Sequence, residues 1–175
     1  MSSFTVEDYY KLNVIDGSKC ELLNGLFEMS PAPRTMHQRI GARLFVDFFQ
    51  FFDGTSCEVF QAPCDVKLGE NIVQPDIFVV CDQSKITEIR CEGIPDLIVE
   101  ILSPNNRKLD LNEKFKLYEK FGLQEYWIVD PDEEWVAQWV LRGDKFILKE
   151  TYGKSDIIVS QVFQELKVGL VKIFK

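Results

Sequence analysis

The feature that most restricts the fold of this chain is a single carboxylate inside an otherwise apolar run. Residues 96–102 read DLIVEIL, and Glu100 stands inside this stretch. A short, continuous apolar run is typical of a central strand that is covered on both faces. A carboxylate there is costly unless it is paired with a cation or bound to a metal. Glu100 is therefore either one half of a buried salt bridge or part of a functional site, and both interpretations stay open at this point.

Short β-rich stretches and hairpin signals dominate the chain around this run. The pair Asn24-Gly25 lies between two apolar runs, which is typical of a β-hairpin near the N-terminus. Polar turns and prolines separate the other apolar stretches, as expected between strands. In chain order, further strands are expected within residues 58–68, 71–81, 96–102, 125–131, 135–141 and 145–152.

Helices are expected in three places. Thr5 and Asp8 have the spacing of a capping pair, which predicts a short helix over residues 5–12. Residues 103–122 predict a turn followed by a helix that ends near Gly122. Between them, Thr35 is positioned to cap an amphipathic helix. The apolar stripe of that helix has three-to-four spacing and consists of Ile40, Leu44, Phe48 and Phe52.

This order of elements predicts an α/β (α+β) fold. We expect one domain over residues 1–175, with a mixed central β-sheet flanked by helices and an N-terminal β-hairpin. The 175 residues are enough to bury a substantial core without disulfides or metals.

The charge balance limits how this chain can meet nucleic acid. Acidic residues outnumber basic ones 28 to 20, for a net charge of −8 and an isoelectric point near 4.8. This excludes binding of nucleic acid by overall charge, which needs a basic excess. Any attraction to phosphates must therefore be local. The candidate basic residues are Arg34, Arg39, Arg43, Arg107 and Lys108.

The cysteines favour a reduced environment. There are five of them, an odd number, and no CxxC pair occurs. Disulfide frameworks and zinc sites have other patterns, so we expect free thiols, and a thiol-based metal or redox protein is the weaker alternative. The polar N-terminus is unlike a signal peptide, and no apolar run approaches the roughly 20 residues of a membrane span. A soluble, cytoplasmic protein without a membrane partner is the expectation.

Asp76 is the best acidic partner for Glu100. It follows Pro75 directly before the apolar stretch IFVVC, on a strand expected to pair with that of Glu100. Paired strands lie about 5 Å apart, which allows two carboxylates to share one ion. Asp96 repeats the Pro-Asp dipeptide, but at about 3.3 Å per residue it lies roughly 13 Å from Glu100 along the same strand. We expect Asp96 to be a turn residue at the beginning of the strand.

A second candidate group follows on the predicted helix. Asp110, Lys114 and Tyr118 are spaced by four residues, which places them on one helical face. The alternative is an ordinary Asp–Lys pair at the surface. Lys114 borders the apolar stripe, whereas Lys116 is expected to point toward water.

Together these motifs carry a resemblance. VQPDIFVVCD, followed by PDLIVEILSPNNRKLDLNEKFKLYEKFGLQEYWIVDP, resembles the restriction-endonuclease-like PD-(D/E)XK superfamily, and more narrowly the Uma family of bacterial restriction-endonuclease-like proteins. The segment ELLNGLFEMSPAPRTMHQRI also resembles the N-terminal hairpin and the His-bearing helix of that family. The resemblance covers nearly the whole chain and implies a restriction-endonuclease-like core.

The resemblance also implies roles for individual residues. Asp76 and Glu100 match the metal-binding acids, and the backbone carbonyl of Ile101 is a further expected ligand for Mg²⁺ or Mn²⁺. The superfamily pattern places a lysine two residues after the Glu, but this chain has Leu102 there. The resemblance implies that the lysine has moved to the following helix as Lys114, which would orient the attacking water and offset charge on phosphorus.

Accessory positions and partners follow from the same resemblance. Glu21, His37, Asp110 and Tyr118 match recurrent polar positions of the family or of this arrangement. For Glu21 the alternative is an exposed hairpin charge, and for His37 a packing residue at the end of a helix. The implied activity is metal-dependent hydrolysis of nucleic acid by a possible homodimer, with DNA rather than RNA as the expected substrate. The competing hypothesis is a catalytically inactive nuclease-fold module that binds a protein or nucleic-acid partner.

Overall fold

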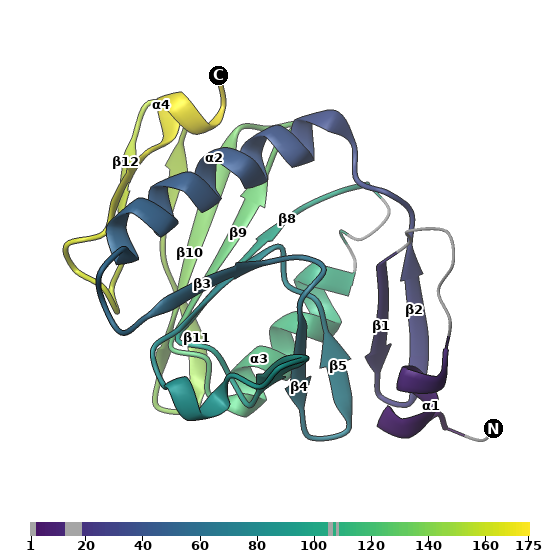
Figure 1. Ribbon diagram of the computed structural model, residues 1–175. Coiled ribbons are helices and arrows are strands. Elements are labelled where there is room, and N and C mark those ends of the chain that lie inside the picture. Colours follow the sequence, from purple (N-terminus) through teal and green to yellow (C-terminus); the bar gives the residue numbers. More distant parts are fainter. Residues whose placement is uncertain (1–2, 13–18, 105–106, 108) are drawn as a thin grey trace.

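A mixed six-stranded sheet forms the centre of the molecule (Figure 1). The computed structural model describes residues 3–12, 19–104, 107 and 109–175, with Asp110 described by its backbone only. Neighbouring strands of this sheet pair antiparallel except β8 and β9, which pair parallel. The predicted mixed central sheet is therefore confirmed. In spatial order its strands are β11 (Lys145–Gly153), β10 (Trp135–Arg142), β9 (Glu125–Asp130), β8 (Leu97–Ile101), β6 (Ile77–Val80) and β3 (Glu58–Gln61).

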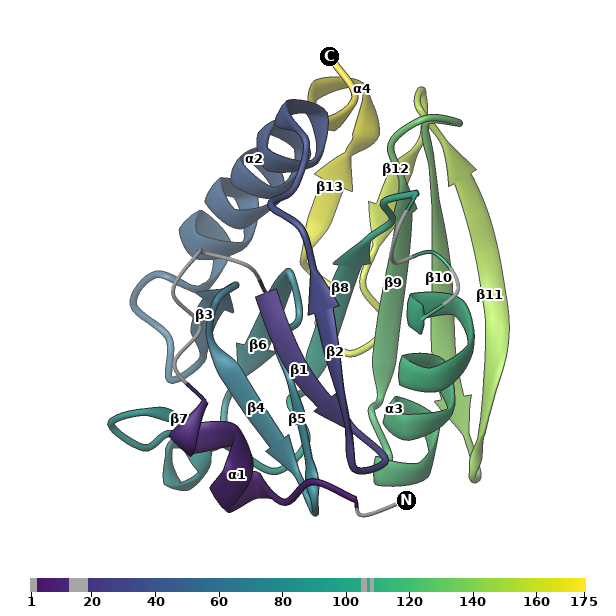
Figure 2. The same cartoon turned by 90° about the vertical axis from the view of Figure 1, so that its right-hand side faces the viewer.

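Helices cover this sheet on both faces, as the apolar run of β8 predicts. Helix α2 (Thr35–Phe52) lies on one face and α3 (Phe115–Phe121) on the other (Figures 1 and 2). Successive side chains of a strand point to opposite faces. Val99 and Ile101 belong to the cluster on the α2 side, whereas Ile98 and Leu102 belong to the cluster on the α3 side. The alternation places Glu100 on the α3 side.

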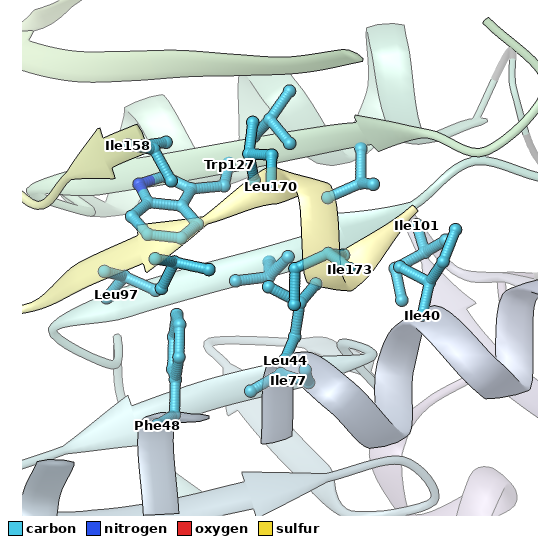
Figure 3. Close-up of a cluster of buried hydrophobic side chains, with 14 of the residues drawn as sticks. Ile40, Leu44, Phe48, Ile77, Leu97, Ile101, Trp127, Ile158, Leu170 and Ile173 are labelled. Carbon is cyan, nitrogen blue, oxygen red and sulfur yellow. The ribbon is translucent and has the colours of Figure 1, made fainter. Parts of the chain in front are cut away.

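The stripe of α2 forms the larger core, as predicted. Its four apolar residues are all buried and pack against the central strands and the C-terminal elements (Figure 3). Phe48 meets Trp127 edge to face, with ring centroids 5.4 Å apart. The predicted cap is wrong by one position, because Thr35 is the first helical residue. Arg34 occupies the N-cap position without a side-chain hydrogen bond.

A second, five-stranded sheet carries the N-terminal hairpin. The hairpin has a two-residue turn in which Asn24 and Gly25 both adopt positive φ, 52° and 77°, as a type I′ turn requires. The short helix α1 (Val6–Lys11) has the predicted capping box between Thr5 and Asp8. In spatial order the strands are β2 (Leu26–Ser30), β1 (Lys19–Leu23), β5 (Asn71–Val73), β4 (Asp65–Leu68) and β7 (Arg90–Glu92).

The helix after β8 departs from regular geometry where it begins. The π-helical segment η2 (Leu109–Lys114) leads directly into α3, and Gly122 ends α3 with a φ of 81°. π-Helical turns are rare and often mark functional positions. The predicted helix end at Gly122 is confirmed, and Lys114 lies at the junction of the two helical forms.

The remaining elements close the core at its edge. A two-stranded sheet and the helix α4 place the apolar side chains of the C-terminal segment against α2, as the sequence predicts. Within the described residues no helix combines the length and apolarity needed to cross a membrane. The elements at this edge are β12 (Ile157–Val159), β13 (Lys167–Gly169) and α4 (Leu170–Ile173), whereas the short helix η1 (Gln83–Lys85) contains no buried residue.

The expectation of five free thiols is wrong for two of them. Cys57 and Cys81 form a disulfide, whereas Cys20, Cys64 and Cys91 are free. The reason is the pairing of β3 with β6, in which Glu58 lies opposite Val80. Cys57, directly before β3, and Cys81, directly after β6, therefore face each other, although they are 24 positions apart in the sequence. The expected cytoplasmic location stays a prediction.

Candidate active site

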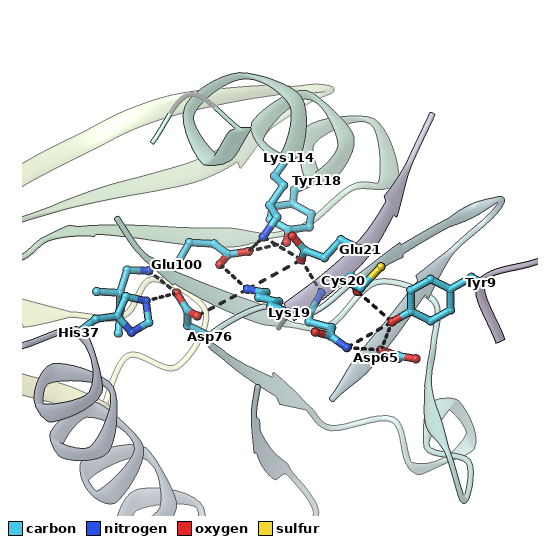
Figure 4. A network of polar contacts seen from close by, with 12 residues as sticks. Tyr9, Lys19, Cys20, Glu21, His37, Asp65, Asp76, Glu100, Lys114 and Tyr118 are labelled. Atoms are coloured by element: carbon cyan, nitrogen blue, oxygen red, sulfur yellow. Dashed lines mark hydrogen bonds and ion pairs between the residues drawn. The ribbon is translucent and has the colours of Figure 1, made fainter. Parts of the chain in front are cut away.

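Strand pairing brings the two predicted metal-binding acids together. In the antiparallel register of β6 and β8, Ile77 lies opposite Val99. Asp76 and Glu100 are one residue beyond this pair on each strand, so they are neighbours at the same end of the two strands. The predicted adjacency of Asp76 and Glu100 is thus found in the structure (Figure 4).

Asp76 is held by donors on two other elements. His37, in the first turn of α2, places its Nε2 atom 3.2 Å from Asp76 Oδ2, and the backbone N–H of Ile101 donates to the same oxygen at 2.7 Å. Burial raises the pKa of Asp76, but Lys19 and His37 outweigh burial and hold that pKa well below its usual range. Burial lowers the pKa of His37, yet the hydrogen bond with Asp76 and its charge raise it above 6.5 overall.

Glu100 is anchored from the helix above it. The Lys114 ammonium lies 2.9 Å from Glu100 Oε1, and the Tyr118 hydroxyl donates to the same oxygen at 2.8 Å. Burial and the charge of Glu100 raise the pKa of Tyr118 well above 10. The four-residue spacing of Lys114 and Tyr118 therefore does place both on one face. Glu100 is one half of a buried salt bridge, so that interpretation is confirmed, and its role in a functional site stays a prediction.

Glu21 is buried beside Asp76, Glu100 and the two lysines, Lys19 and Lys114, and we call these five residues the acidic cluster. The Glu21 side chain is fully buried, which excludes the alternative of an exposed hairpin charge. Glu21 Oε1 accepts from the backbone N–H of Gln74 at 2.6 Å and lies 2.9 Å from the Lys114 ammonium. Glu21 Oε2 is buried without a hydrogen-bond partner among the described residues. Lys114 thus bridges two carboxylates that come from separate sheets.

Lys19 is the site residue that sequence reasoning missed. Its ammonium lies 3.6 Å from Asp76 Oδ1, 4.0 Å from Glu100 Oε2 and 3.8 Å from Glu21 Oε1. Burial lowers the pKa of Lys19, but Glu21, followed by Asp76 and Glu100, raises it above 10.5 overall. The available signal was the strand alternation of β1, because Lys19 and Glu21 are two residues apart and face the same way.

The site has a deep side and a solvent side. Lys114 has no exposed side-chain surface and Glu100 only 1%. Asp76, His37 and Lys19 retain 11, 14 and 16%. A molecule that approaches from solvent would therefore meet Asp76 and Lys19 before Lys114. Leu102, at the usual lysine position of the superfamily, is buried in the apolar cluster on the α3 side.

Other predicted residues lie elsewhere. Asp96 directly precedes β8 and accepts the backbone N–H of Cys81 at 2.8 Å, as expected of a turn residue. Arg43 donates to the carbonyl oxygens of Ile173 and Lys175, and Arg107 pairs with Asp130 at 2.7 Å. These two arginines are therefore engaged in structural contacts.

Two of the remaining candidates can be placed and two cannot. Arg34 and Arg39 are exposed at the beginning of α2. Lys108 and the side chain of Asp110 lie outside the described residues. Arg34 and Arg39 thus flank His37 in the sequence, at the end of α2 whose His37 contacts Asp76.

The oxygen donors of the site suit a hard divalent cation. Asp76 and Glu100 supply carboxylate oxygens from neighbouring strands, and a cation, the Lys19 ammonium, already lies between them. Within the described residues no three His, Cys, Asp or Glu side chains form a ready metal cage. Magnesium sites commonly use only one or two carboxylates, with water and substrate phosphate completing the shell. Asp76 and Glu100 therefore fit as the protein ligands of such an ion.

The fold has a close match among solved structures. A crystal structure described as "a putative nuclease belonging to DUF820", from Anabaena variabilis ATCC 29413, superposes with a TM-score of 0.77. The match covers 98% of this chain and 97% of that one at 22% sequence identity. At this level of identity the likeness shows a shared fold.

Sequence comparison finds a relative of this chain and a family that matches it. The "Uncharacterized protein slr1290" of Synechocystis sp. (strain ATCC 27184 / PCC 6803 / Kazusa) is 29% identical over 126 residues, or 70% of this chain. That alignment spans 66% of the relative's own length. Residues 6–170 match the Uma2 family, which is described as "Putative restriction endonuclease". This match contains the hairpin, both helices that flank the central sheet and every residue of the acidic cluster, and the chain therefore belongs to the Uma2 family.

Proposed function

We propose that this protein is a metal-dependent endonuclease that hydrolyses phosphodiester bonds of nucleic acid, DNA in the first place. The nuclease-like description of the family supports this class of reaction. The observation that carries the proposal is the convergence of three carboxylates and two lysines from both sheets and the helix after β8 on one point (Figure 4). Burying several charges together lowers the stability of the fold, and a hydrolytic function would explain why the chain keeps them.

The residues of the site have different roles in this proposal. Asp76 and Glu100 would hold Mg²⁺ or Mn²⁺, with the carbonyl of Ile101 as a further ligand. The bound ion supplies Lewis-acid polarisation of a phosphoryl oxygen and activation of water. His37 fixes the orientation of Asp76, and Tyr118 fixes that of Glu100, because each contacts one oxygen of its carboxylate. This leaves the other oxygen of each carboxylate facing the Lys19 ammonium.

Lys114 takes a positioning role in this proposal. Its ammonium holds Glu21 and Glu100 at 2.9 Å each and has no exposed surface, so contact with a phosphate is left to groups nearer the solvent. The exposed Arg34 and Arg39, which flank His37 in the sequence, would supply positive charge for a phosphate. Because one site cuts one strand, cleavage of a duplex by this protein would use two copies, and the proposal includes a homodimer.

Cleavage assays with a matched pair of acid variants test the proposal. Plasmid DNA, single-stranded DNA and RNA are incubated with the wild type, Glu100→Gln and Asp96→Asn in Mg²⁺, in Mn²⁺ and in EDTA. Both substitutions remove one carboxylate charge at nearly constant volume, and both residues lie on or next to β8. We expect metal-dependent cleavage that Glu100→Gln reduces by 10²-fold or more and Asp96→Asn leaves near the wild-type rate.

Two results would contradict the proposal. Cleavage that continues in EDTA would remove the role of the metal, and equal loss in both variants would place the site elsewhere. Activity on RNA alone would correct the substrate and keep the reaction class.

An inactive nuclease-fold module is the second candidate, and two observations favour it. The acids of the cluster are ion-paired within the chain, and Leu102 replaces the strand lysine. This candidate predicts that the wild type binds nucleic acid or a protein partner but cleaves none of the three substrates with either metal.

A further inference from the structure

The two metal-binding acids share an arrangement that their sequence positions do not show. Each uses one oxygen for internal contacts: Asp76 Oδ2 contacts His37 and Ile101, and Glu100 Oε1 contacts Lys114 and Tyr118. The second oxygen of each, Asp76 Oδ1 and Glu100 Oε2, faces the Lys19 ammonium. The lysine therefore lies where one cation can interact with both carboxylates.

The two lysines of the cluster are held very differently. Lys114 approaches its carboxylates at 2.9 Å, the length of a charge-assisted hydrogen bond. Lys19 stands 3.6 to 4.0 Å from its three carboxylates, beyond hydrogen-bonding distance from each of them. Lys114 is fully buried, whereas Lys19 keeps 16% of its side chain exposed and is the first residue of β1. Lys19 thus attracts the carboxylates by charge without close contacts, and its flexible stem can turn toward solvent.

We propose that Lys19 is the resident cation of the Asp76–Glu100 pair and that a divalent ion binds there only by displacing its ammonium. This inference rests on the proposed function, because it assigns the same two carboxylates to the metal. A divalent ion carries twice the charge of the ammonium and contacts carboxylate oxygens more closely, so it wins the exchange at sufficient concentration. Without metal, Lys19 keeps the acids from repelling each other. Lys19 therefore sets the metal concentration at which the site fills.

Calorimetric titration with Mn²⁺ tests the competition directly. The proteins are the wild type, Lys19→Met, Lys19→Arg and the exposed control Lys116→Met. Lys19→Met removes the competing charge and keeps most of the stem, so we expect its Mn²⁺ dissociation constant to fall at least about tenfold. Lys19→Arg and Lys116→Met should stay near the wild type. Adding Glu100→Gln to Lys19→Met should abolish the gain, which locates it at this site.

A second experiment uses the wild type alone and so does not depend on the folding of a variant. Lysines are acylated briefly with an N-hydroxysuccinimide ester, with and without Mn²⁺, and the labelled residues are counted by mass spectrometry. Displacement predicts that Mn²⁺ increases labelling of Lys19 severalfold and leaves Lys116 unchanged.

The results separate this inference from the proposed function. Mn²⁺ affinity in Lys19→Met that is equal to or weaker than in the wild type, or Lys19 labelling that Mn²⁺ does not increase, would overturn the role of Lys19. Tighter Mn²⁺ binding without cleavage of any substrate would keep that role and count against the endonuclease.

Discussion

Two buried glutamates on neighbouring parallel strands have opposite surroundings. Glu125, at the beginning of β9, is fully buried and accepts hydrogen bonds from five neutral donors. They are the side chains of Trp127, Gln138 and Ser160 and the backbone N–H groups of Gln161 and Val162, at 2.6 to 3.0 Å. Glu100, near the end of β8, is instead surrounded by Lys114, Tyr118 and Lys19.

The difference teaches how a structural carboxylate differs from one in the proposed site. Neutral donors that occupy both oxygens fix Glu125 in place and join β9 to β10 and to the C-terminal segment. The partners of Glu100 include cations, and one cation can be exchanged for another. Its neighbour Glu21 also keeps a buried oxygen without a hydrogen-bond partner among the described residues. Burial alone does not mark a functional site, and the exchangeable counter-charges around Glu100 are the feature on which the proposed site rests.

The largest expected loss of stability comes from removing the structural carboxylate, Glu125. Glu125→Ala removes the acceptor of five hydrogen bonds and leaves buried donors unsatisfied, so the free energy of unfolding should fall by about 5 kcal/mol. Urea denaturation measures the loss. Saturating Mn²⁺ should recover none of it, since this carboxylate lies outside the proposed metal site; recovery by Mn²⁺ would erase the distinction between the two glutamates.

Lys114→Met should lower the free energy of unfolding somewhat less than Glu125→Ala. The substitution leaves Glu21 and Glu100 buried without their shared counter-charge, which should lower the free energy of unfolding by about 3 to 4 kcal/mol. Here Mn²⁺ should restore part of the loss, because a metal can replace the missing positive charge. Mn²⁺ should still bind, whereas metal-dependent cleavage should fall by roughly 10²-fold through misplacement of Glu100. Lys116→Met is the control, and equal cleavage by both variants would remove Lys114 from the site.

Glu100→Gln should have a smaller effect on stability. The amide oxygen can still accept the hydrogen bond from Tyr118, and Lys114 keeps Glu21, so the expected loss is about 1 to 2 kcal/mol. Isothermal titration should show the loss of Mn²⁺ binding in the same variant. A stability loss as large as that of Glu125→Ala would mean that Glu100 is as structural as Glu125.

Tyr118→Phe should have the smallest effect. It deletes one hydrogen bond to Glu100 while the ring keeps its packing against Tyr126, so about 1 kcal/mol should be lost. Because Lys114 still holds the same oxygen, the Mn²⁺ affinity should change by no more than a few-fold. Loss of Mn²⁺ binding in this variant would show that the hydroxyl, rather than the lysine, orients Glu100.

Local patterns in the sequence predict much of this fold. The run DLIVEIL does form a strand covered on both faces, and Asn24-Gly25 does form the hairpin turn. Spacing within one element is set by the geometry of that element, so such features can be read along the chain. The Cys57–Cys81 disulfide depends on which strands pair and in which register, and Thr35 shows that the end of a helix can shift by one residue.

The site was predictable to the extent that its residues share one element or two paired strands. Asp76 with Glu100, and Lys114 with Tyr118, were found in this way. The bridge from Lys114 to Glu21 and the central place of Lys19 could not be found, because they depend on how the hairpin sheet packs against the central sheet. Strand alternation places Lys19 beside Glu21 on one face, but nothing along the chain says what that face meets.

Anomalous diffraction from crystals grown with Mn²⁺ tests the central claim most directly, since it locates the ion without any substitution. The account predicts one Mn²⁺ peak within bonding distance of the Asp76 and Glu100 carboxylates, with the Lys19 ammonium moved away from its present position between them. At saturating Mn²⁺, the absence of a peak at these two residues, with Lys19 still between them, would contradict it.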